Sequence, residues 1–416
     1  MRKSSGVSAN VRVALASAAL LVSAATNAAW ENVPEVSMLV GAADNARLDE
    51  SGSQDSASMS TIDAATTLSN FTERGNIYVA PRIQIDTYLD SQNEELDSED
   101  YFFDAGGSYR WRLVNANFRS AYRRRSILNA EIADVEPVDP DADPGDIIDS
   151  ETGRLSFFQE QREDWNVTGN VDFRLTERNR FQVGALRRTV AYSGGAASSG
   201  RSDFDVTGVN LGLLRSVDQR NTVSARMTVA EYTAARTDNT TDSVALEGTF
   251  SRPLAPTWTM NLTAGVQRSD YNFRDEQTLL RVDNAATNST FSLGFRKRGE
   301  RTQWNLDFSH RAEPNATGFV ALRDEVLTYV THSFSQRLSG TFGTRLSRTA
   351  TLDNVRAEDE RDYVRVDFGL EWAISRRMFL FGGYDFISQK FVNESDDETS
   401  SNTVYLGVSY RGLSRQ

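Results

Sequence analysis

The feature that most constrains the fold is a strict alternation of apolar and polar residues in one long segment after another. In DWNVTGNVDFRLTERNRFQVG, residues 164–184, the odd-numbered positions from Trp165 to Leu175 are mostly apolar, and the even-numbered positions from Asn166 to Thr176 are polar. A period of two places successive side chains on opposite faces of a β-strand. The pattern therefore predicts strands with one apolar and one polar face.

The same alternation recurs along the chain, for example in segments 77–89, 257–266, 303–310 and 361–375. Short polar stretches that predict tight turns separate many of these segments: 72–75, 114–117, 176–179, 218–221, 254–257, 298–301, 335–338 and 375–378. Between these turns lie longer segments rich in Asp, Glu, Asn, Gly and Ser: 91–100, 129–153, 194–202, 351–360 and 393–401. Alternating short turns and long loops are typical of outer-membrane barrels.

We therefore predict an all-β fold, an antiparallel transmembrane β-barrel of about 16–18 strands with short periplasmic turns and longer outer loops. An even number of strands puts both ends of the chain on the periplasmic side. The alternative is a soluble all-β sandwich or propeller, in which the apolar face would point inward. The continuous series of strands, the alternating loop lengths and the export signal described next favour the barrel.

The beginning of the chain predicts export. Arg2 and Lys3 precede an apolar run at residues 13–25, and small residues follow it. This is the pattern of a secretory signal peptide, here residues 1–29, with cleavage expected after Ala28 or Ala29. The alternative is an uncleaved anchor. Residues 30–416 would form the barrel, with 30–58 as a first strand or a periplasmic N-terminal segment. We expect the mature chain in the outer membrane of a Gram-negative cell.

Composition removes several classes of function. The net charge of the 416 residues is −13, which argues against a nucleic-acid-binding protein. The chain has no cysteine and only two histidines, His310 and His332, and neither lies beside a pattern that suggests a catalytic triad or a metal site. We therefore predict a protein that is not an enzyme and has no cofactor. The expected partners are membrane lipid, lipopolysaccharide and the barrel-assembly machinery.

Five arginines form the candidate site. They alternate with aromatic residues on two adjacent predicted strands and so share the polar face: Arg110, Arg112, Arg119, Arg123 and Arg125. In a barrel this face lines the lumen, where basic residues favour anionic solutes or chains. The alternative is that the arginines pair with lumen acids such as Asp86 and Asp104 and only brace the wall.

An acidic stretch at residues 134–151 suggests a solvated outer loop. Asp139, Asp141 and Asp143 resemble the start of a calcium-binding loop, but the glycine comes one place late, at Gly145, and Ser150 occupies the position of the usual glutamate. The sequence therefore favours loose bridging by divalent ions over a specific calcium site.

The stretch WENVPEVSMLVGAADNARL, residues 30–48, contains Asp44-Asn45 followed by Leu48, and amphipathic hairpins follow it. With these features the chain resembles the outer-membrane β-barrel porin family associated with exopolysaccharide export and PEP-CTERM/exosortase loci. The resemblance covers almost all of the mature chain. It implies an outer-membrane pore for a surface polysaccharide, with polysaccharide and export components as partners, and it implies no catalytic residue.

Two features depart from the pattern expected of such barrels. Pro81 lies within a predicted strand, where it removes one hydrogen bond between strands. The C-terminal sequence VYLGVSYRGLSRQ lacks a terminal aromatic residue, and Tyr410 is the nearest candidate.

The predicted function is an outer-membrane channel, for export of an extracellular polysaccharide or for passive diffusion of anionic solutes. A plugged structural or adhesive outer-membrane protein, in which acidic surface loops carry the function, is the alternative. The sequence identifies neither the cargo nor the oligomeric state.

Overall fold

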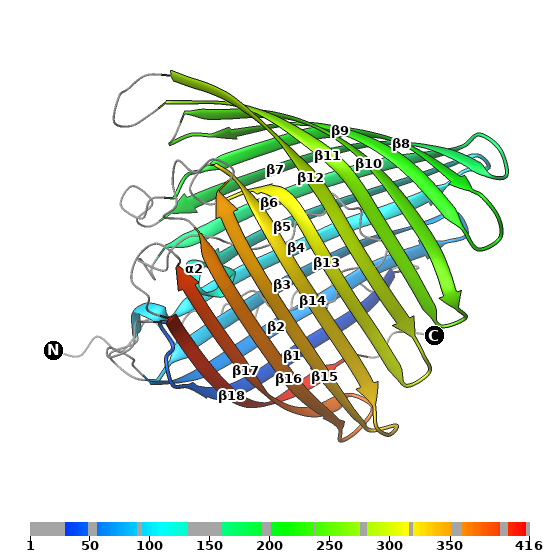
Figure 1. The fold of residues 1–416 in the computed structure, drawn as a ribbon. Helices are drawn as coiled ribbons and strands as arrows, with labels where there is room; N and C mark the ends of the chain where they lie inside the picture. The colour runs from blue at the N-terminus through cyan, green and yellow to red at the C-terminus, as the bar shows by residue number, and fades with distance from the viewer. Residues whose placement is uncertain are drawn as a thin grey trace.

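The computed structural model describes residues 30–48, 56–89, 94–131, 160–193, 201–236, 238–274, 281–315, 319–351, 360–391 and 398–412. They form a closed barrel of 18 antiparallel strands (Figure 1), which confirms the predicted fold class. The predicted signal peptide at 1–29 and the calcium hypothesis for the acidic stretch 134–151 lie outside the described residues.

The strands follow one another around the barrel in chain order. Their bounds are β1 (Trp30–Ala43), β2 (Ala57–Thr72), β3 (Gly75–Tyr88), β4 (Ser98–Arg110), β5 (Val114–Ser126), β6 (Gln161–Arg174), β7 (Asn179–Ser193), β8 (Phe204–Ser216), β9 (Thr222–Ala234), β10 (Asn239–Ala255), β11 (Trp258–Arg274), β12 (Arg281–Arg298), β13 (Thr302–Pro314), β14 (Val320–Ser333), β15 (Leu338–Thr351), β16 (Arg361–Ala373), β17 (Met378–Phe391) and β18 (Glu398–Arg411). Two short helices, η1 (Glu94–Leu96) and α2 (Ile127–Glu131), lie in the connections.

The barrel closes between β1 and β18. β1 pairs with β2 on one side and with β18 on the other, so no strand edge is left open. Arg411 lies 2.8 Å from Glu35 across this seam, and the Gly412 amide donates to the Pro34 carbonyl at 2.6 Å. The first and last strands therefore begin and end at the same end of the barrel, where the short turns are.

The Asp44–Leu48 stretch that carries the family resemblance has a structural role at the other end of this seam. The Asp44 carboxylate accepts hydrogen bonds of 2.7 Å from the Asn402 amide and side chain, and Asn45 donates to the Ser400 carbonyl at 3.0 Å. Leu48 packs with residues of β16 and β17 at a positive φ of 55°, which a branched side chain rarely adopts. The stretch thus fastens the chain after β1 to the strands that close the barrel.

Eight short connections lie at one end of the barrel, and most connections at the other end are longer, as predicted. The clearest exception is the connection between β9 and β10, residues 235–238, which is as short as a turn. The predicted turn at 114–117 is wrong, because the connection is 111–113 and β5 already begins at Val114; the other seven predicted turns overlap the observed ones. Several turns share one hydrogen bond, in which a Ser, Thr or Asp side chain early in the turn accepts from the backbone amide three residues later. Thr176 does so with Asn179, Ser335 with Leu338, and Asp218 with Asn221. Backbone hydrogen bonds from Arg220 and Asn221 lower the pKa of Asp218.

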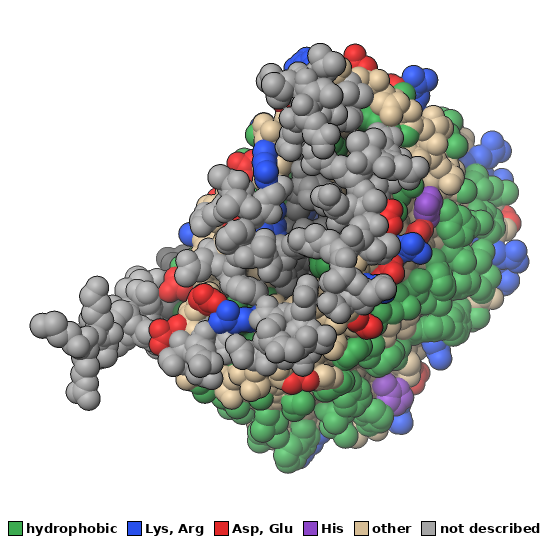
Figure 2. Space-filling view, turned by 60° about the vertical axis from the view of Figure 1, so that its left-hand side comes forward, with side chains coloured by type: hydrophobic (Ala, Val, Ile, Leu, Met, Phe, Trp, Pro, Cys, Tyr) green, Lys and Arg blue, Asp and Glu red, His purple; other side chains and the backbone are tan. Residues whose placement is uncertain are grey.

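The two faces of the sheet differ as the alternation predicts. Large apolar side chains are exposed on the outer face, for example Val40, Leu211, Leu246, Val266 and Leu406. On the side of the barrel that Figure 2 shows, hydrophobic side chains form a broad area. Charged and polar side chains are buried on the inner face, which faces the barrel interior. This is the reverse of a soluble sandwich, whose apolar residues pack inside. The structure therefore excludes the soluble all-β alternative.

Pro81 interrupts the ladder between strands, as predicted. Residues of β2 and β3 pair on both sides of Thr66 and Thr67, but these two positions have no partner in the β2–β3 register, opposite Pro81 and Ala80. On its other side Thr66 pairs with Pro34 of β1. Thr66 instead makes a side-chain hydrogen bond of 2.5 Å to Asn32 on the outer face. The hydrogen bond between Thr66 and Asn32 thus lies where β2 has a proline of β1 on one side and a proline of β3 on the other.

Candidate site on the inner face of the barrel

The five predicted arginines lie on one wall but do not form a ring. Arg119, Arg123 and Arg125 lie on the inner face of β5, and Arg110 is the last residue of β4 on the same face. Arg112 lies in the turn between these strands. The arginines therefore follow the length of the wall, from Arg125 near the loop end to Arg112 at the turn end. Their attraction for an anionic cargo stays a prediction.

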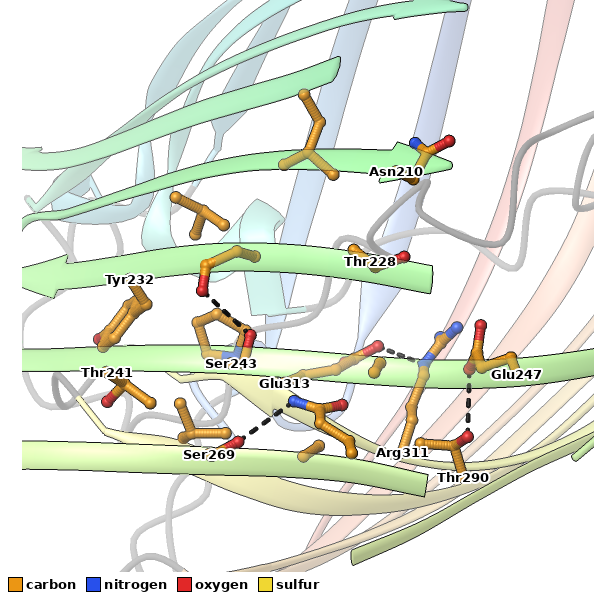
Figure 3. A pocket seen from close by; sticks show the side chains of 18 of the residues that line it. Asn210, Thr228, Tyr232, Thr241, Ser243, Glu247, Ser269, Thr290, Arg311 and Glu313 are labelled. Atoms are coloured by element: carbon orange, nitrogen blue, oxygen red, sulfur yellow. Dashed lines mark hydrogen bonds and ion pairs between the residues drawn. The ribbon is translucent and has the colours of Figure 1, made fainter. Parts of the chain in front are cut away.

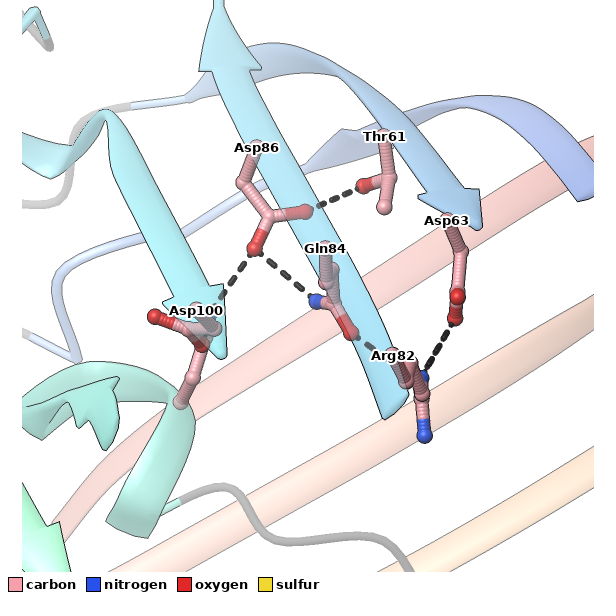
Figure 4. Close-up of polar contacts among 7 residues, drawn as sticks. Thr61, Asp63, Arg82, Gln84, Asp86 and Asp100 are labelled. Atoms are coloured by element: carbon pink, nitrogen blue, oxygen red, sulfur yellow. Dashed lines mark hydrogen bonds and ion pairs between the residues drawn. The ribbon is translucent and has the colours of Figure 1, made fainter. Parts of the chain in front are cut away.

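The alternative role, pairing with lumen acids, is observed for one of the two acids that the sequence suggested. Arg119 lies 3.7 Å from Asp104, and both side chains are partly exposed to the interior. Asp86 accepts hydrogen bonds from Thr61 at 2.5 Å and from Gln84 at 3.0 Å (Figure 4). Gln84 also accepts from Arg82, which binds Asp63 at 2.7 Å. One polar chain thus runs across β2 and β3.

The helix α2 packs against this part of the inner face. Its Asn129 donates to Asp86 at 2.7 Å and to Asp100 at 2.8 Å, and the amide of Ser126 donates to Asp100 at 2.9 Å. Ile127 joins an apolar cluster of β7, β8 and β9, and Leu128 joins another with residues of β1 and β2. The start of the connection between β5 and β6 therefore folds into the barrel and bridges two parts of its wall.

Two further groups of charges are buried on the inner face. On β6 and β7, Asp164 binds Arg188 at 2.5 Å and Arg162 at 3.2 Å. On β14 and β15, Glu325 binds Arg323 at 2.8 Å and Arg345 at 2.9 Å. These side chains are each less than one tenth exposed. The cations of the inner face are arginines, whereas the two described lysines, Lys297 and Lys390, lie on the outer face. Arginine stays charged and can bind a carboxylate with two donors.

Between the charged walls lies a less charged wall with a pocket. Among the described residues, the inner faces of β8 to β11 carry only two charged side chains, Arg226 and Glu247. The pocket (Figure 3) has a volume of about 1080 Å3, including open space, and is lined by residues of β7 to β14. Arg311 and Glu313 form an ion pair at its side, and Thr290 donates to Glu247 at 3.1 Å. No residue of this pocket belongs to a motif that marks a site in the sequence.

The two histidines lie on the outer face. His310 binds Asp324 at 2.6 Å, and His332 hydrogen-bonds to Thr302 at 2.8 Å. The described residues contain no group of three or more His, Cys, Asp or Glu side chains that could hold a metal ion. Within the same described ranges, no helix is long and apolar enough to cross a membrane.

No known sequence family matches the chain, and no characterised protein has a matching sequence. Among solved structures, the chain is similar to a BenF-like porin from Pseudomonas fluorescens Pf-5, with 12% identity, a TM-score of 0.45, and 93% of this chain and 99% of that chain covered. It is also similar to the siderophore receptor PiuA from Acinetobacter baumannii, with 9% identity, a TM-score of 0.46, and 92% and 82% covered. OccAB4 from the same species gives 9% identity, a TM-score of 0.43, and 92% and 98% covered. These low values assign neither a family nor a substrate to the chain.

Proposed function

We propose that this protein is an outer-membrane channel through which small polar solutes, anions among them, diffuse passively. The observation that carries the proposal is the arrangement of the two faces. A closed barrel of 18 strands has large apolar side chains exposed outside and buried charged side chains inside. An apolar outer face suits lipid, and barrels of about 16–18 strands are wide enough for an aqueous lumen.

The tryptophans support a membrane location. Trp30 begins β1, Trp258 begins β11, and Trp372 is the next-to-last residue of β16, all at the turn end. Trp304 packs against Trp258 with ring centroids 5.3 Å apart. Aromatic residues gather at the interfaces of membrane barrels, where an apolar ring and a polar nitrogen are both accommodated. The turn end would therefore lie at the periplasmic interface.

Preference for anions follows from the arginines of β5. Arg119 and Arg123 face the interior, where each guanidinium places a positive charge. A pore lined by fixed positive charge concentrates anions and repels cations. Acids of the same face, Asp104 among them, weaken this field. We therefore expect a modest anion preference.

Two finer expectations stay predictions. Export of an extracellular polysaccharide rests only on the family resemblance, which residues 30–48 and the amphipathic hairpins after them carry. The plugged structural or adhesive alternative rests on acidic loops, such as 134–151, that lie outside the described residues. α2 narrows the interior, and its Ile127 belongs to the same apolar cluster as Val206 and Tyr232, which also line the pocket.

The test is the conductance of the refolded barrel in a planar lipid bilayer, with the reversal potential measured in a salt gradient. Stepwise conductance with a reversal potential on the anion side supports the proposal. The control is heat-modifiable mobility in electrophoresis, which shows that the barrel has folded. Folded protein that never conducts would contradict the channel and would support the plugged alternative.

A further inference from the structure

The inner face carries a continuous row of uncharged residues across eight neighbouring strands. Each member is the register partner of the next. We call it the neutral row, and its members from β5 to β12 are Asn117, Asn170, Gly184, Asn210, Thr228, Ala245, Gln267 and Asn288. Carboxamides occupy five of these eight positions. An amide carries both donors and acceptors, so the row offers hydrogen bonds of both kinds without charge.

The small residues of the row leave room for the amides. A side chain on Gly184 would collide with Asn170 and Asn210, which reach over the glycine from the strands on either side. Asn210, Thr228, Ala245 and Gln267 all line the pocket of Figure 3. The pocket therefore includes four members of the row, and the row extends beyond it at both ends.

Several polar atoms around the pocket are buried and make no hydrogen bond. They are the Asn210 Oδ1, the Thr241 Oγ1 and the Tyr232 Oη within the pocket lining, and the Asn288 Nδ2 at the end of the row. Asn210, Thr241 and Tyr232 are each less than one tenth exposed. A buried polar atom without a partner costs about 1–3 kcal/mol. These acceptors, donors and hydroxyls are thus available to a ligand that can both donate and accept.

The remaining lining adds an apolar surface. Tyr232 packs against Phe204 with ring centroids 5.4 Å apart, and both belong to the apolar cluster that Ile127 of α2 joins. Leu186 and Val206 also line the pocket. A pocket lined by one tyrosine and several aliphatic side chains, with hydroxyls and amides beside them, suits a ligand that is apolar on its ring faces and polar at its edges.

We propose that the neutral row and its pocket form a binding track for uncharged sugars, one or a few rings long. A sugar hydroxyl donates one hydrogen bond and accepts others, which matches the unpartnered atoms around the pocket. Strands of membrane barrels tilt by about 35–45°, so a row that runs across the strands is inclined to the barrel axis and passes through different depths. Neighbouring members lie about 4.8 Å apart, which lets one sugar move from contact to contact.

The pocket of the track lies on other strands than the arginines of the proposed anion pathway, and only the first member of the row, Asn117, shares the inner face of β5 with them. Anions are attracted by the positive charges of Arg119 and Arg123 on β5, whereas neutral sugars have no net charge for these residues to attract. The inner face would therefore serve two solute classes on two walls. This inference goes beyond the proposed function, and the sugar contact can be measured whether or not the barrel conducts.

The experiment is saturation-transfer NMR of the refolded barrel in detergent with raffinose, a neutral trisaccharide, followed by block of the ion current by raffinose in a bilayer. The row variant is Asn210→Leu with Gln267→Leu, which removes two amides and keeps their bulk. The matched control is Asn305→Leu with Gln303→Leu, the same change on the inner face of β13 outside the row. Thr228→Val with Thr241→Val is a milder second variant, in case the first fails to fold.

We expect a saturation-transfer signal from raffinose with the wild type and with the control variant. The two test variants should bind raffinose about tenfold more weakly, because each loses one or two hydrogen bonds of about 1 kcal/mol. Raffinose should also block current more than a polyethylene glycol of similar size. No transfer to wild type, or equal transfer to row and control variants, would overturn the track. Conductance without a sugar signal would support the channel and contradict the track. A sugar signal without conductance would support the track and contradict the channel.

Discussion

Arg188 donates two hydrogen bonds to Asp164, from Nε at 3.1 Å and from Nη2 at 2.5 Å, and both side chains are buried on the inner face of the barrel. Arg162 also contacts this carboxylate, at 3.2 Å. A buried carboxylate is tolerated because the two cations compensate for its lost hydration. The neighbouring strands β6 and β7 are therefore joined by charge as well as by their backbone ladder.

Replacing Asp164 should destabilise the barrel more than replacing an exposed acid nearby. Asp164→Asn removes the carboxylate charge that Arg162 and Arg188 share in the buried inner face, which costs about 3–5 kcal/mol. Asp205→Asn, in the exposed 3.9 Å pair with Arg187, should cost about 1 kcal/mol or less. Reversible urea unfolding in lipid vesicles measures both. Equal losses for the two variants would mean that the buried pair contributes no more than the exposed one.

The arginines should differ in their effect on selectivity according to their place. Arg119→Ser with Arg123→Ser removes charge from the inner face of β5, so the reversal potential should shift toward cations. Arg112→Ser, which changes a residue of the turn, should leave it nearly unchanged. The variant with all five replaced by serine should shift at least as far as the β5 pair alone. A five-serine variant with unchanged selectivity would remove the role that we assign to these residues.

Loosening α2 should change the pore. Asn129→Ala removes the donors to Asp86, Asp100 and Ser98, at a cost of about 1–3 kcal/mol to the docked helix. We expect larger and noisier single-channel currents, because α2 lies against the inner wall. Asn129→Asp should act more strongly, since it places a third carboxylate beside two others.

The matched control for this test is Asn76→Ala. Asn76 also bonds across strands on the inner face, to Ser108, but near the turn end and away from α2. Its current should resemble that of the wild type. If Asn129→Ala and the control behave alike, α2 does not limit the current.

Two glycines should respond differently to the same substitution. A Cβ on Gly383 would lie 2.5 Å from the Phe368 carbonyl oxygen and against the Tyr405 ring, so Gly383→Ala requires backbone movement. Such overpacking costs about 1–3 kcal/mol. A Cβ on Gly248 meets only two carbonyl oxygens at 3.9 Å, so Gly248→Ala should be nearly neutral. Urea unfolding in vesicles compares the two, and equal stabilities would contradict the crowding at Gly383.

The fold follows from local patterns. Alternation within each segment predicts a strand with one apolar and one polar face. Turn residues such as Thr176 and Ser335 accept a hydrogen bond from a backbone amide only three residues away. The one misplaced turn has a local cause as well. Asn115 and Asn117 look like turn residues, but they occupy inner-face positions of β5, where polar side chains are also expected.

The sequence indicated part of the candidate site. It placed Arg119, Arg123 and Arg125 on one polar face, and the structure puts them on the inner face of β5. It offered only a weak signal for the neutral row, namely polar positions without charge in segments such as 204–216 and 239–255. Period-two alternation marks a residue as polar-side but does not give its neighbours on other strands.

The sequence by itself determined the strands, their two faces and nearly all of their turns, because the backbone period and the chemistry of turns act over a few residues. Only the tertiary structure decided which polar residues meet. Register across eight strands aligns Asn117 with Asn288, closure brings Glu35 to Arg411, and the fold of α2 brings Asn129 to Asp86. Those contacts depend on strand pairing and on residues far apart in the chain, which no local pattern specifies.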